Sequence, residues 1–285
     1  MAINESARID VLKTYKLFIG GAFPRSESGR SYAIKDFKGS HLANPCLASR
    51  KDLRDSVVAA RGAFAGWSGA TAYNRGQILY RMAEILEGRT SQLVGEICAL
   101  EGVTPKVATQ QVAESIDLLV WYAGWSDKIS TLAGSTNPVS GPYYNFSIPE
   151  PIGVVAIFAA AKPSLLSLVG AIASVITSGN TAIVIAAEKF PLSAITFAEC
   201  MATSDLPGGV VNILTGVSSE LAPWVASHMD IDAIDASGLT PKILKDVQVA
   251  GVQNLKRIKV HSSIKTPQRI LDFMETKTVW HPIGI

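Results

Sequence analysis

Charged residues are scarce in this sequence and are scattered along it. They make up 18% of the 285 residues, the formal net charge is only +2, and no run of five like charges occurs. Nucleic-acid-binding domains usually carry clustered basic residues, so this composition argues against a nucleic-acid partner. Hydrophobic residues reach 48%, which favours a folded chain with a well-buried core over a disordered one.

Cysteine is also rare, with only Cys46, Cys98 and Cys200 in the chain. Their spacing fits neither a zinc site nor a disulfide framework, and a small odd number suits the reducing cytoplasm. The first residues, MAINESARID, are polar and lack the apolar core of a signal peptide. We therefore expect a cytoplasmic protein without a metal site.

Long hydrophobic runs are interrupted before they could span a membrane. The stretch from Gly153 to Ala187 is nearly uncharged, but Lys162-Pro163 and Gly179-Asn180 divide it. The apolar piece between these breaks is about 15 residues, shorter than the roughly 18–20 that a spanning helix needs. We expect no membrane span and interpret this piece as a buried helix between two buried strands.

The first half of the chain predicts short strands followed by helices. Glycines within KLFIGGAF and SESGRSYAIKDF indicate tight turns between short strands. Apolar residues then recur at helical spacing over residues 52–67 and 74–89, and Asn74 is a candidate N-cap for the second helix. A third apolar helix is expected from about Val112 to Ile129.

From Gly153 onward, five short apolar strands alternate with four helices. Three of the helical segments have proline near their first turn, at Pro163, Pro191 and Pro241, a position where proline is tolerated. This alternation predicts an α/β fold with a doubly wound parallel sheet. The predicted strands are GVVAIFAA, TAIVIAA, VVNILTG, IDAIDAS and LKRIKVHS.

Two further segments have the character of exposed strands. Residues 141–151, GPYYNFSIPEP, are aromatic and flanked by proline, and residues 275–285, ETKTVWHPIGI, are β-branched. Trp280 and Ile283 would be unusual in a solvated terminus, because an unpaired apolar strand exposes hydrogen-bonding groups and apolar surface. We expect the tail to pair with the 141–149 arm of a second copy of the chain.

The order of these segments resembles the NAD(P)-dependent aldehyde dehydrogenase superfamily over nearly the whole chain. LFIGGAF resembles its opening hairpin, and Phe64, Trp67 and Arg75 fall in a segment like its first helices. EPIGVVAIF, SGNTAIVI, LPGGVVNILTG and VASHMDIDAI follow its cofactor domain in order, and TKTVWHPIG resembles its last strand.

This resemblance implies a Rossmann-like cofactor domain with a small β oligomerisation arm. The cofactor domain would comprise residues 1–138 and 151–265, and the arm and tail would comprise residues 139–150 and 266–285. The family's separate catalytic domain has no counterpart, because IKTPQRILDFMETKTVW leads almost directly to the last strand. The chain is similar in this respect to the second, catalytically incomplete region of family-sixteen aldehyde dehydrogenases.

The positions that the resemblance makes catalytic carry unsuitable residues. The family's nucleophile is a cysteine of the catalytic domain, but no cysteine follows Cys200, which lies on a predicted helix where a buried thiol is inert. Ala160 and Ala161 occupy the places of a Trp-Asn pair whose amide helps to hold the oxyanion, and a methyl group cannot donate a hydrogen bond. His261 replaces the general-base Glu and is expected to be a partly exposed residue at a strand end.

Part of the family's cofactor site is retained and part is lost. Glu188 matches a Glu that binds the adenosine ribose, although it could equally be an ordinary surface residue, and Gly238 matches a glycine of the phosphate-binding turn. Ile185 replaces a ribose-binding Lys, Leu239 replaces a Ser, and Ile243 replaces a Gly where its side chain would crowd the phosphates. We expect weak NAD(P) binding or none.

Three functions remain open at this point. The first is a non-catalytic subunit or oligomerisation scaffold that pairs with itself or with a catalytic aldehyde dehydrogenase. The second is a nucleotide-binding or sensing module that uses the residual cleft near Glu188 and Gly238. The third is aldehyde oxidation only when a partner chain supplies the missing cysteine.

Overall fold

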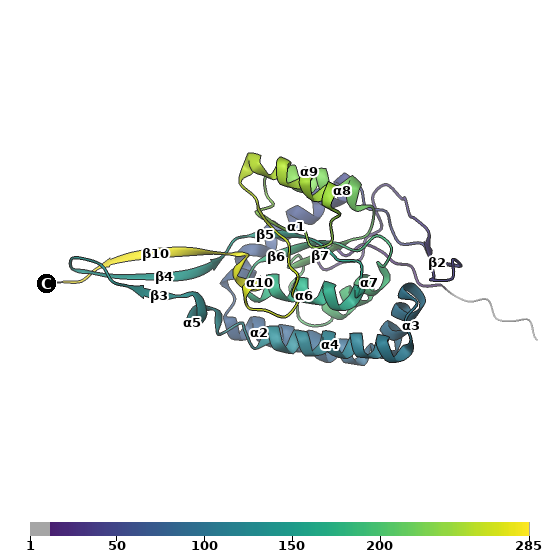
Figure 1. Ribbon diagram of the computed structural model, residues 1–285, viewed down its shortest axis with the longest axis horizontal. Coiled ribbons are helices and arrows are strands. Elements are labelled where there is room, and N and C mark those ends of the chain that lie inside the picture. The colour runs from purple at the N-terminus through teal and green to yellow at the C-terminus, as the bar shows by residue number, and fades with distance from the viewer. Residues whose placement is uncertain (1–11, 285) are drawn as a thin grey trace, which may run out of the picture.

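The computed structural model describes residues 12–284 and has a five-stranded parallel β-sheet at its centre (Figure 1). The strand order is β7-β6-β5-β8-β9, with a helix between each strand and the next along the chain. The predicted doubly wound α/β fold is therefore confirmed. The strands are β5 (Val154–Phe158), β6 (Thr181–Ile185), β7 (Val211–Leu214), β8 (Ala233–Asp235) and β9 (Arg257–Lys259).

The side chains of β5 alternate between two hydrophobic cores, one on each face of the sheet. Val155 and Ile157 belong to one core, whereas Val154, Ala156 and Phe158 belong to the other. Successive side chains of a strand point to opposite faces, so a strand covered on both sides must be apolar throughout. This explains why the strand appears in the sequence as an unbroken apolar run.

Helices cover both faces of the sheet (Figure 1). α1, α8 and α9 lie on one face; α6 and α7 lie on the other, with α2, α3 and α4 as an outer layer beyond them. α6 is buried along its whole length because it lies between the sheet and that outer layer. The bounds are α1 (Arg50–Gly69), α2 (Ala72–Gly88), α3 (Thr90–Glu101), α4 (Pro105–Ala123), α6 (Ser164–Thr177), α7 (Leu192–Met201), α8 (Ser218–Ser227) and α9 (Pro241–Gly251).

α6 accounts for most of the uncharged stretch that the sequence places between two buried strands. Within residues 12–284, no helix combines the length and the apolar character needed to cross a bilayer.

Capping residues set the helix ends, and two of the predicted ends were wrong. The second helix begins after Thr71, whose hydroxyl accepts the N–H of Asn74 at 3.2 Å, so Thr71 is the N-cap and Asn74 is already inside the helix. The third apolar helix is α4, which begins after the N-cap Thr104 and ends before Gly124, earlier than the predicted 112–129. α3, which precedes α4, was not predicted.

The predicted arm and tail form one antiparallel sheet that projects from the body of the molecule (Figure 1). β4 (Tyr143–Pro151) pairs with β10 (Met274–Pro282) along its full length, and β3 (Ser135–Asn137) pairs with its other edge. The expected pairing of the tail with a second copy is therefore replaced by pairing within the chain. The hydrogen-bonding groups on one side of the tail are satisfied without a partner.

The arm boundaries also differ from those expected. Residues 135–137 join the arm as β3, and α10 (Gln268–Leu271) packs against α6 in the body. The remaining short elements are β1 (Ile34–Lys35), β2 (His41–Ala43), α5 (Ile129–Ala133) and the 3-10 helix η1 (Val252–Asn254).

Candidate functional site

The sheet changes its direction of winding between β5 and β8. The chain proceeds from β5 to β6 and β7 on one side, and then returns to place β8 and β9 on the other side of β5. Ligands of doubly wound folds bind at such a switch point, beyond the carboxyl ends of the strands. A cavity of about 320 Å³ lies there, lined in part by Phe158, Ala160, Ser237, His261 and Arg269.

Ala160 and Ala161 lie just beyond the carboxyl end of β5, as the resemblance implies. Ala160 lines the cavity and is half-buried, whereas Ala161 is exposed. Neither side chain has a hydrogen-bond donor, so neither can stabilise negative charge on a bound oxygen.

His261 lies on the segment after β9, but its environment differs from the expected partly exposed one. Its side chain is only 7% exposed and lies between two carboxylates: Nε2 is 3.1 Å from Oδ2 of Asp272, and Nδ1 is 3.4 Å from Oδ2 of Asp235. The backbone N–H of His261 donates to the hydroxyl of Ser237 at 2.9 Å. Nε2 of the imidazole is therefore hydrogen-bonded to Asp272, whereas Nδ1 faces Asp235 at a longer distance.

Asp235, at the end of β8, is the centre of this charged cluster. It is fully buried, its Oδ2 accepts a hydrogen bond from Nη2 of Arg269 at 2.7 Å, and its Oδ1 accepts one from the Ser237 hydroxyl at 2.5 Å. Burial alone would raise the pKa of Asp235, but the His261 imidazole and the Arg269 guanidinium outweigh it and hold the pKa well below its usual range. Asp235 is thus a buried carboxylate with fixed partners and a poor general base.

Asp272, which follows α10, completes the cluster. Hydrogen bonds from Gln268 and His261 hold the pKa of Asp272 below its usual value, although partial burial acts in the opposite direction. Asp272 lies 3.5 Å from Lys259 of β9, and Arg269 pairs with Asp235 of β8, so these two residues attach the segment between β9 and β10 to the carboxyl edge of the sheet.

The cysteines lie away from this cavity. Cys200 is on α7, is fully buried, and places Sγ 3.5 Å from the backbone oxygen of Thr196. Burial is the main cause that raises the pKa of the Cys200 thiol to about 11, so the nucleophilic thiolate is scarce at neutral pH. None of the described residues that line the cavity is a cysteine, and no cluster suited to a metal ion occurs within residues 12–284.

Glu188 lies in a different depression from His261. It is exposed beyond β6, beside a hollow of about 350 Å³ that Tyr32 and Phe190 also line. The Tyr32 hydroxyl donates to the backbone oxygen of Glu188 at 3.3 Å, and burial followed by the Glu188 charge raises the pKa of this phenol. The Glu188 carboxylate is exposed to solvent, but Glu188 does not line the cavity at the switch point.

Gly238 has a structural reason to be glycine. A Cβ atom at this position would lie 2.3 Å from the backbone oxygen of Ala159 and 2.5 Å from that of Phe158. Its N–H donates to Phe158 at 2.9 Å, which ties the loop after β8 to the end of β5. The neighbouring Ser237 hydroxyl is already engaged by Asp235 and by the N–H of His261, so it is not free for a phosphate.

Apolar side chains occupy the other positions of the expected cofactor site. Ile185 is fully buried at the end of β6 as part of the core on the α8 and α9 side. Leu239 and Ile243 are half-buried against that same core. Pro241 is the first residue of α9, so that helix end lacks one of the N–H donors with which helices hold phosphate. The residues present are a poor fit for a dinucleotide pyrophosphate.

The sequence interpretation identified His261 but missed its three charged partners. Asp235 could have been found, because it ends an apolar strand and the carboxyl ends of parallel strands meet at one edge. Arg269 and Asp272 carry a weaker signal, because they are two charges three residues apart in a segment that the sequence assigns to the arm and tail.

Comparisons with known proteins agree with this architecture. The profile of the aldehyde dehydrogenase family matches residues 23–281. Cytosolic 10-formyltetrahydrofolate dehydrogenase of Xenopus laevis is 32% identical over 261 residues, which are 89% of this chain and 29% of that protein. Retinal dehydrogenase 2 of Mus musculus is 33% identical over 265 residues, which are 91% of this chain and 50% of that protein.

A solved structure leads to the same family. The NAD+ complex of aldehyde dehydrogenase from Bacillus cereus superposes with a TM-score of 0.82 and 26% identity, over 87% of this chain and 50% of that one. The chain thus spans about half or less of the length of these relatives. Because the family profile covers most of the sequence and the sheet matches the family's Rossmann-like cofactor domain, this chain belongs to the aldehyde dehydrogenase family.

Proposed function

We propose that this chain is a non-catalytic member of the family that acts as a subunit or an oligomerisation scaffold. The observation that carries the proposal is the short connection between β9 and β10. Only residues 260–273 lie between the end of β9 and the start of β10, and β10 returns directly to pair with β4. Two elements of the fold are thus joined by a short segment that leaves no space for another domain between them.

The chemistry of the cavity supports the same proposal. Acyl transfer from an aldehyde needs a nucleophile and donors directed at the developing oxyanion. Ala160 and Ala161 supply only methyl groups at the positions of the family's Trp-Asn pair, and His261 is held between two carboxylates. The positive charge of Arg269 neutralises the buried carboxylate of Asp235 and is not directed at a substrate. We therefore infer that the cluster of Asp235, His261, Arg269 and Asp272 stabilises the edge of the sheet, and that it has no nucleophile to activate.

Weak or absent NAD(P) binding is part of the proposal. The fold is that of a family with an NAD+ complex among its solved structures. In this chain, however, Ile185 is core, Pro241 has no N–H, and the Ser237 hydroxyl is already engaged. Each change removes a polar contact that a ribose or phosphate would need.

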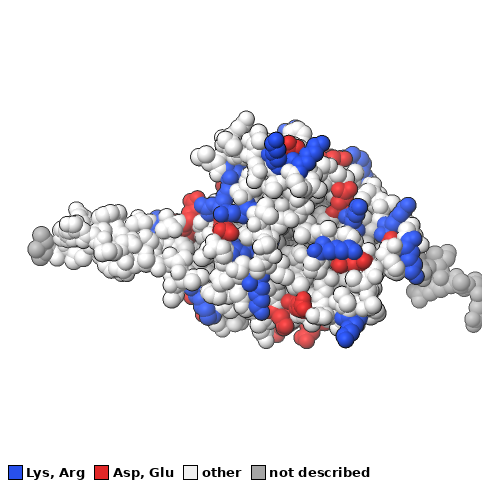
Figure 2. Space-filling model, in the orientation of Figure 1, with Lys and Arg blue, Asp and Glu red and all other residues white. Residues whose placement is uncertain are grey.

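The arm is the surface that would mediate assembly. Its outer residues include large apolar side chains that are 44–58% exposed, and in Figure 2 the visible face of the arm is mostly free of charge. Apolar patches of this kind usually mark an interface. These side chains are Tyr143, Tyr144, Trp280 and Ile283. The partner would be a second copy or a catalytic aldehyde dehydrogenase, in the cytoplasm.

Enzymatic assays test the proposal directly. The purified chain should give no NAD-dependent oxidation of aldehydes and no hydrolysis of a test ester. The Cys200→Ser variant should give the same background rates in both assays. Ester turnover that disappears in Cys200→Ser would overturn the proposal. Aldehyde oxidation that appears only after a purified catalytic relative is added, beyond that relative's own rate, would favour the alternative of a partner-dependent enzyme.

A nucleotide-sensing module remains the second candidate, on the ground that the Glu188 carboxylate is exposed. Low-micromolar NAD affinity, lowered by Glu188→Gln, would favour it over the scaffold.

A further inference from the structure

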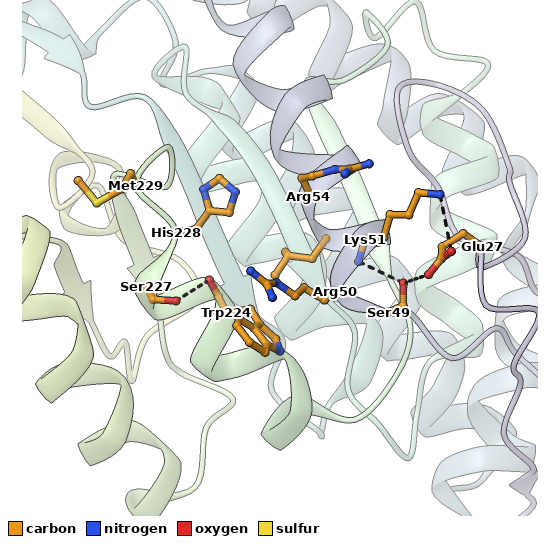
Figure 3. Close-up of a pocket in the computed structure, with 10 residues that line it drawn as sticks. Glu27, Ser49, Arg50, Lys51, Arg54, Trp224, Ser227, His228 and Met229 are labelled. Atoms are coloured by element: carbon orange, nitrogen blue, oxygen red, sulfur yellow. Dashed lines mark hydrogen bonds and ion pairs between the residues drawn. The ribbon is translucent and has the colours of Figure 1, made fainter.

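A groove outside the cofactor cleft combines basic and aromatic side chains. It lies between the start of α1 and the end of α8 and has a volume of about 700 Å³ (Figure 3). That volume is within the usual range for small-molecule sites. The groove shares no lining residue with the cavity at the switch point or with the hollow beside Glu188.

Positive charge is concentrated on the α1 side of this groove. Arg50, Lys51 and Arg54 all line it, within the first two turns of α1. Lys51 is 3.7 Å from Glu27, and Arg54 is 2.7 Å from Asp55, and all four side chains are at least 40% exposed. Water screens such exposed pairs, so these bases remain available to an anion.

Arg50 differs from the other two because a ring, and not a carboxylate, is its partner within residues 12–284. Its guanidinium carbon lies 3.9 Å from the centroid of the Trp224 ring, and Figure 3 shows the two side chains next to each other in the groove. Trp224 is 41% exposed. A guanidinium stacked on an indole keeps its N–H groups at the edge, where they are free to donate.

The placement of these bases does not serve the stability of α1. The N-terminus of a helix carries partial positive charge, so Arg50 and Lys51 in the first turn oppose the helix dipole. Asp52 already caps the helix together with Ser49, and their side chains accept from the N–H groups of Ser49, Lys51 and Asp52. Residues that work against local stability in a groove are expected where they serve binding.

His228 adds an imidazole to the groove. It lines the groove at the end of α8, and burial is the main cause that lowers its pKa, while the charges of Lys256 and Arg50 lower it further and that of Asp230 raises it. The lowered pKa favours the uncharged imidazole beside the bases.

We propose that the groove between α1 and α8 binds a small ligand that joins a planar ring to an anionic group. The ring would pack against the exposed part of Trp224, and the phosphate or carboxylate would accept hydrogen bonds from Arg50 and Arg54. Leu53, which is buried beneath the groove, supplies an apolar base for the ring. This site is independent of the cofactor cleft and of catalysis.

Calorimetry with defined probes tests the proposal. Adenosine 5′-monophosphate and indole-3-carboxylate distinguish a phosphate from a carboxylate, and adenosine and inorganic phosphate each supply one half of the ligand. At least one of the two complete probes should bind, and both halves should bind more weakly. Arg50→Gln and Trp224→Leu should each weaken that binding about tenfold or more, through loss of a charge-assisted contact or of the stacking surface.

Two controls make the outcome decisive. Arg81→Gln removes an exposed arginine of α2 that pairs with Glu84, and it should leave the affinity unchanged. Glu188→Gln tests whether the probe occupies the cofactor cleft instead. The proposal is overturned if neither complete probe binds the unaltered chain, if Arg50→Gln binds as well as Arg81→Gln, or if only Glu188→Gln loses binding. All variants concern exposed side chains, and equal melting temperatures will establish that they fold.

Discussion

Arg269 and Asp235 form an ion pair in which Nη2 and Oδ2 are 2.7 Å apart and neither side chain is more than 3% exposed. The pair joins α10 to the end of β8, two elements that are 34 positions apart along the chain. A buried pair of this kind adds little net stability by itself, but removal of one partner leaves an uncompensated charge in the interior.

Loss of one member of this pair should destabilise the fold strongly. Arg269→Ala leaves the carboxylate of Asp235 buried without its cation, and we expect the free energy of unfolding to fall by about 3 kcal/mol or more. Urea denaturation provides the measurement. The matched control is Lys277→Ala, which removes an exposed ion pair with Glu150 on the arm and should change stability by less than about 1 kcal/mol. Equal effects of the two substitutions would contradict this interpretation.

The same cluster predicts loss of stability in acid. The folded-state pKa of Asp235 lies below its unfolded value, so its contribution is fully present above about pH 4 and declines as the pH falls toward the folded pKa. Asp272 should add a smaller contribution of the same sign. Unfolding free energies measured between pH 6 and pH 2 should show a shallower decline for Asp235→Asn than for the unaltered chain. Parallel curves for the two proteins would rule out this role of Asp235.

Thiol reactivity should follow burial. Cys200 is fully buried with a pKa raised to about 11, and Cys46 is 7% exposed, whereas Cys98 is half-buried. A chromogenic disulfide at pH 8 should therefore leave Cys200 unmodified in the native chain and titrate three thiols in denaturant. Cys200→Ser should lower the denatured count by one and leave the native count unchanged. Rapid native modification of Cys200, identified by peptide mapping, would show that this thiol is accessible.

Restoration of a single polar residue should not restore NAD binding. An unmet hydrogen bond in a buried site costs about 1–3 kcal/mol, so two or three lost contacts lower affinity by orders of magnitude. Ile185→Lys should therefore change the NAD affinity little, because Pro241 and the engaged Ser237 hydroxyl remain. Calorimetry that gives a low-micromolar dissociation constant for the unaltered chain would contradict weak binding.

Deletion of the tail should disrupt assembly. Without residues 276–285, β4 loses its partner along most of its length and the apolar side chains of the arm lose their support. Multi-angle light scattering should then find smaller species, or the protein should become insoluble. Trp280→Ser separates assembly from folding, because Trp280 is 58% exposed and its ring packs edge-on against that of Tyr143, which is also exposed. This variant should keep its melting temperature but give a smaller assembly by light scattering. If both variants keep the assembly mass of the unaltered chain, the arm is not the interface and a scaffold role loses its support.

The sheet could be predicted from sequence because inner strands such as β5 and β6 are short apolar runs between helices, whereas the edge strand β9 contains two basic residues. β5 illustrates this, since burial on both faces leaves no polar position to confuse the pattern. The start of α2 was misplaced because Thr71 and Asn74 are both good caps, and only the hydrogen bond of the Thr71 hydroxyl distinguishes them. The two residues lie three positions apart, so the choice between them moves the predicted start of the helix by almost one turn.

The charged cluster could not be predicted in the same way. Asp235, His261 and Arg269 belong to three different elements, and their contacts depend on how α10 turns back onto the sheet. The pairing of β10 with its own β4 has a similar cause. Both strands were identified, but local pattern does not specify whether two exposed strands meet within a chain or between chains.

Because Gly238 lies so close to the end of β5, glycine is required at this position whether or not a cofactor binds. A side chain there would collide with the backbone of Ala159 whether or not any nucleotide binds. Selection for folding alone would therefore keep this glycine in lineages that have abandoned dehydrogenase chemistry. Divergence should proceed faster at neighbouring exposed positions, such as Thr240 and Lys242, than at Gly238 itself. In family members that have lost catalysis, this glycine therefore serves as a marker of the strand packing and gives no information about nucleotide binding.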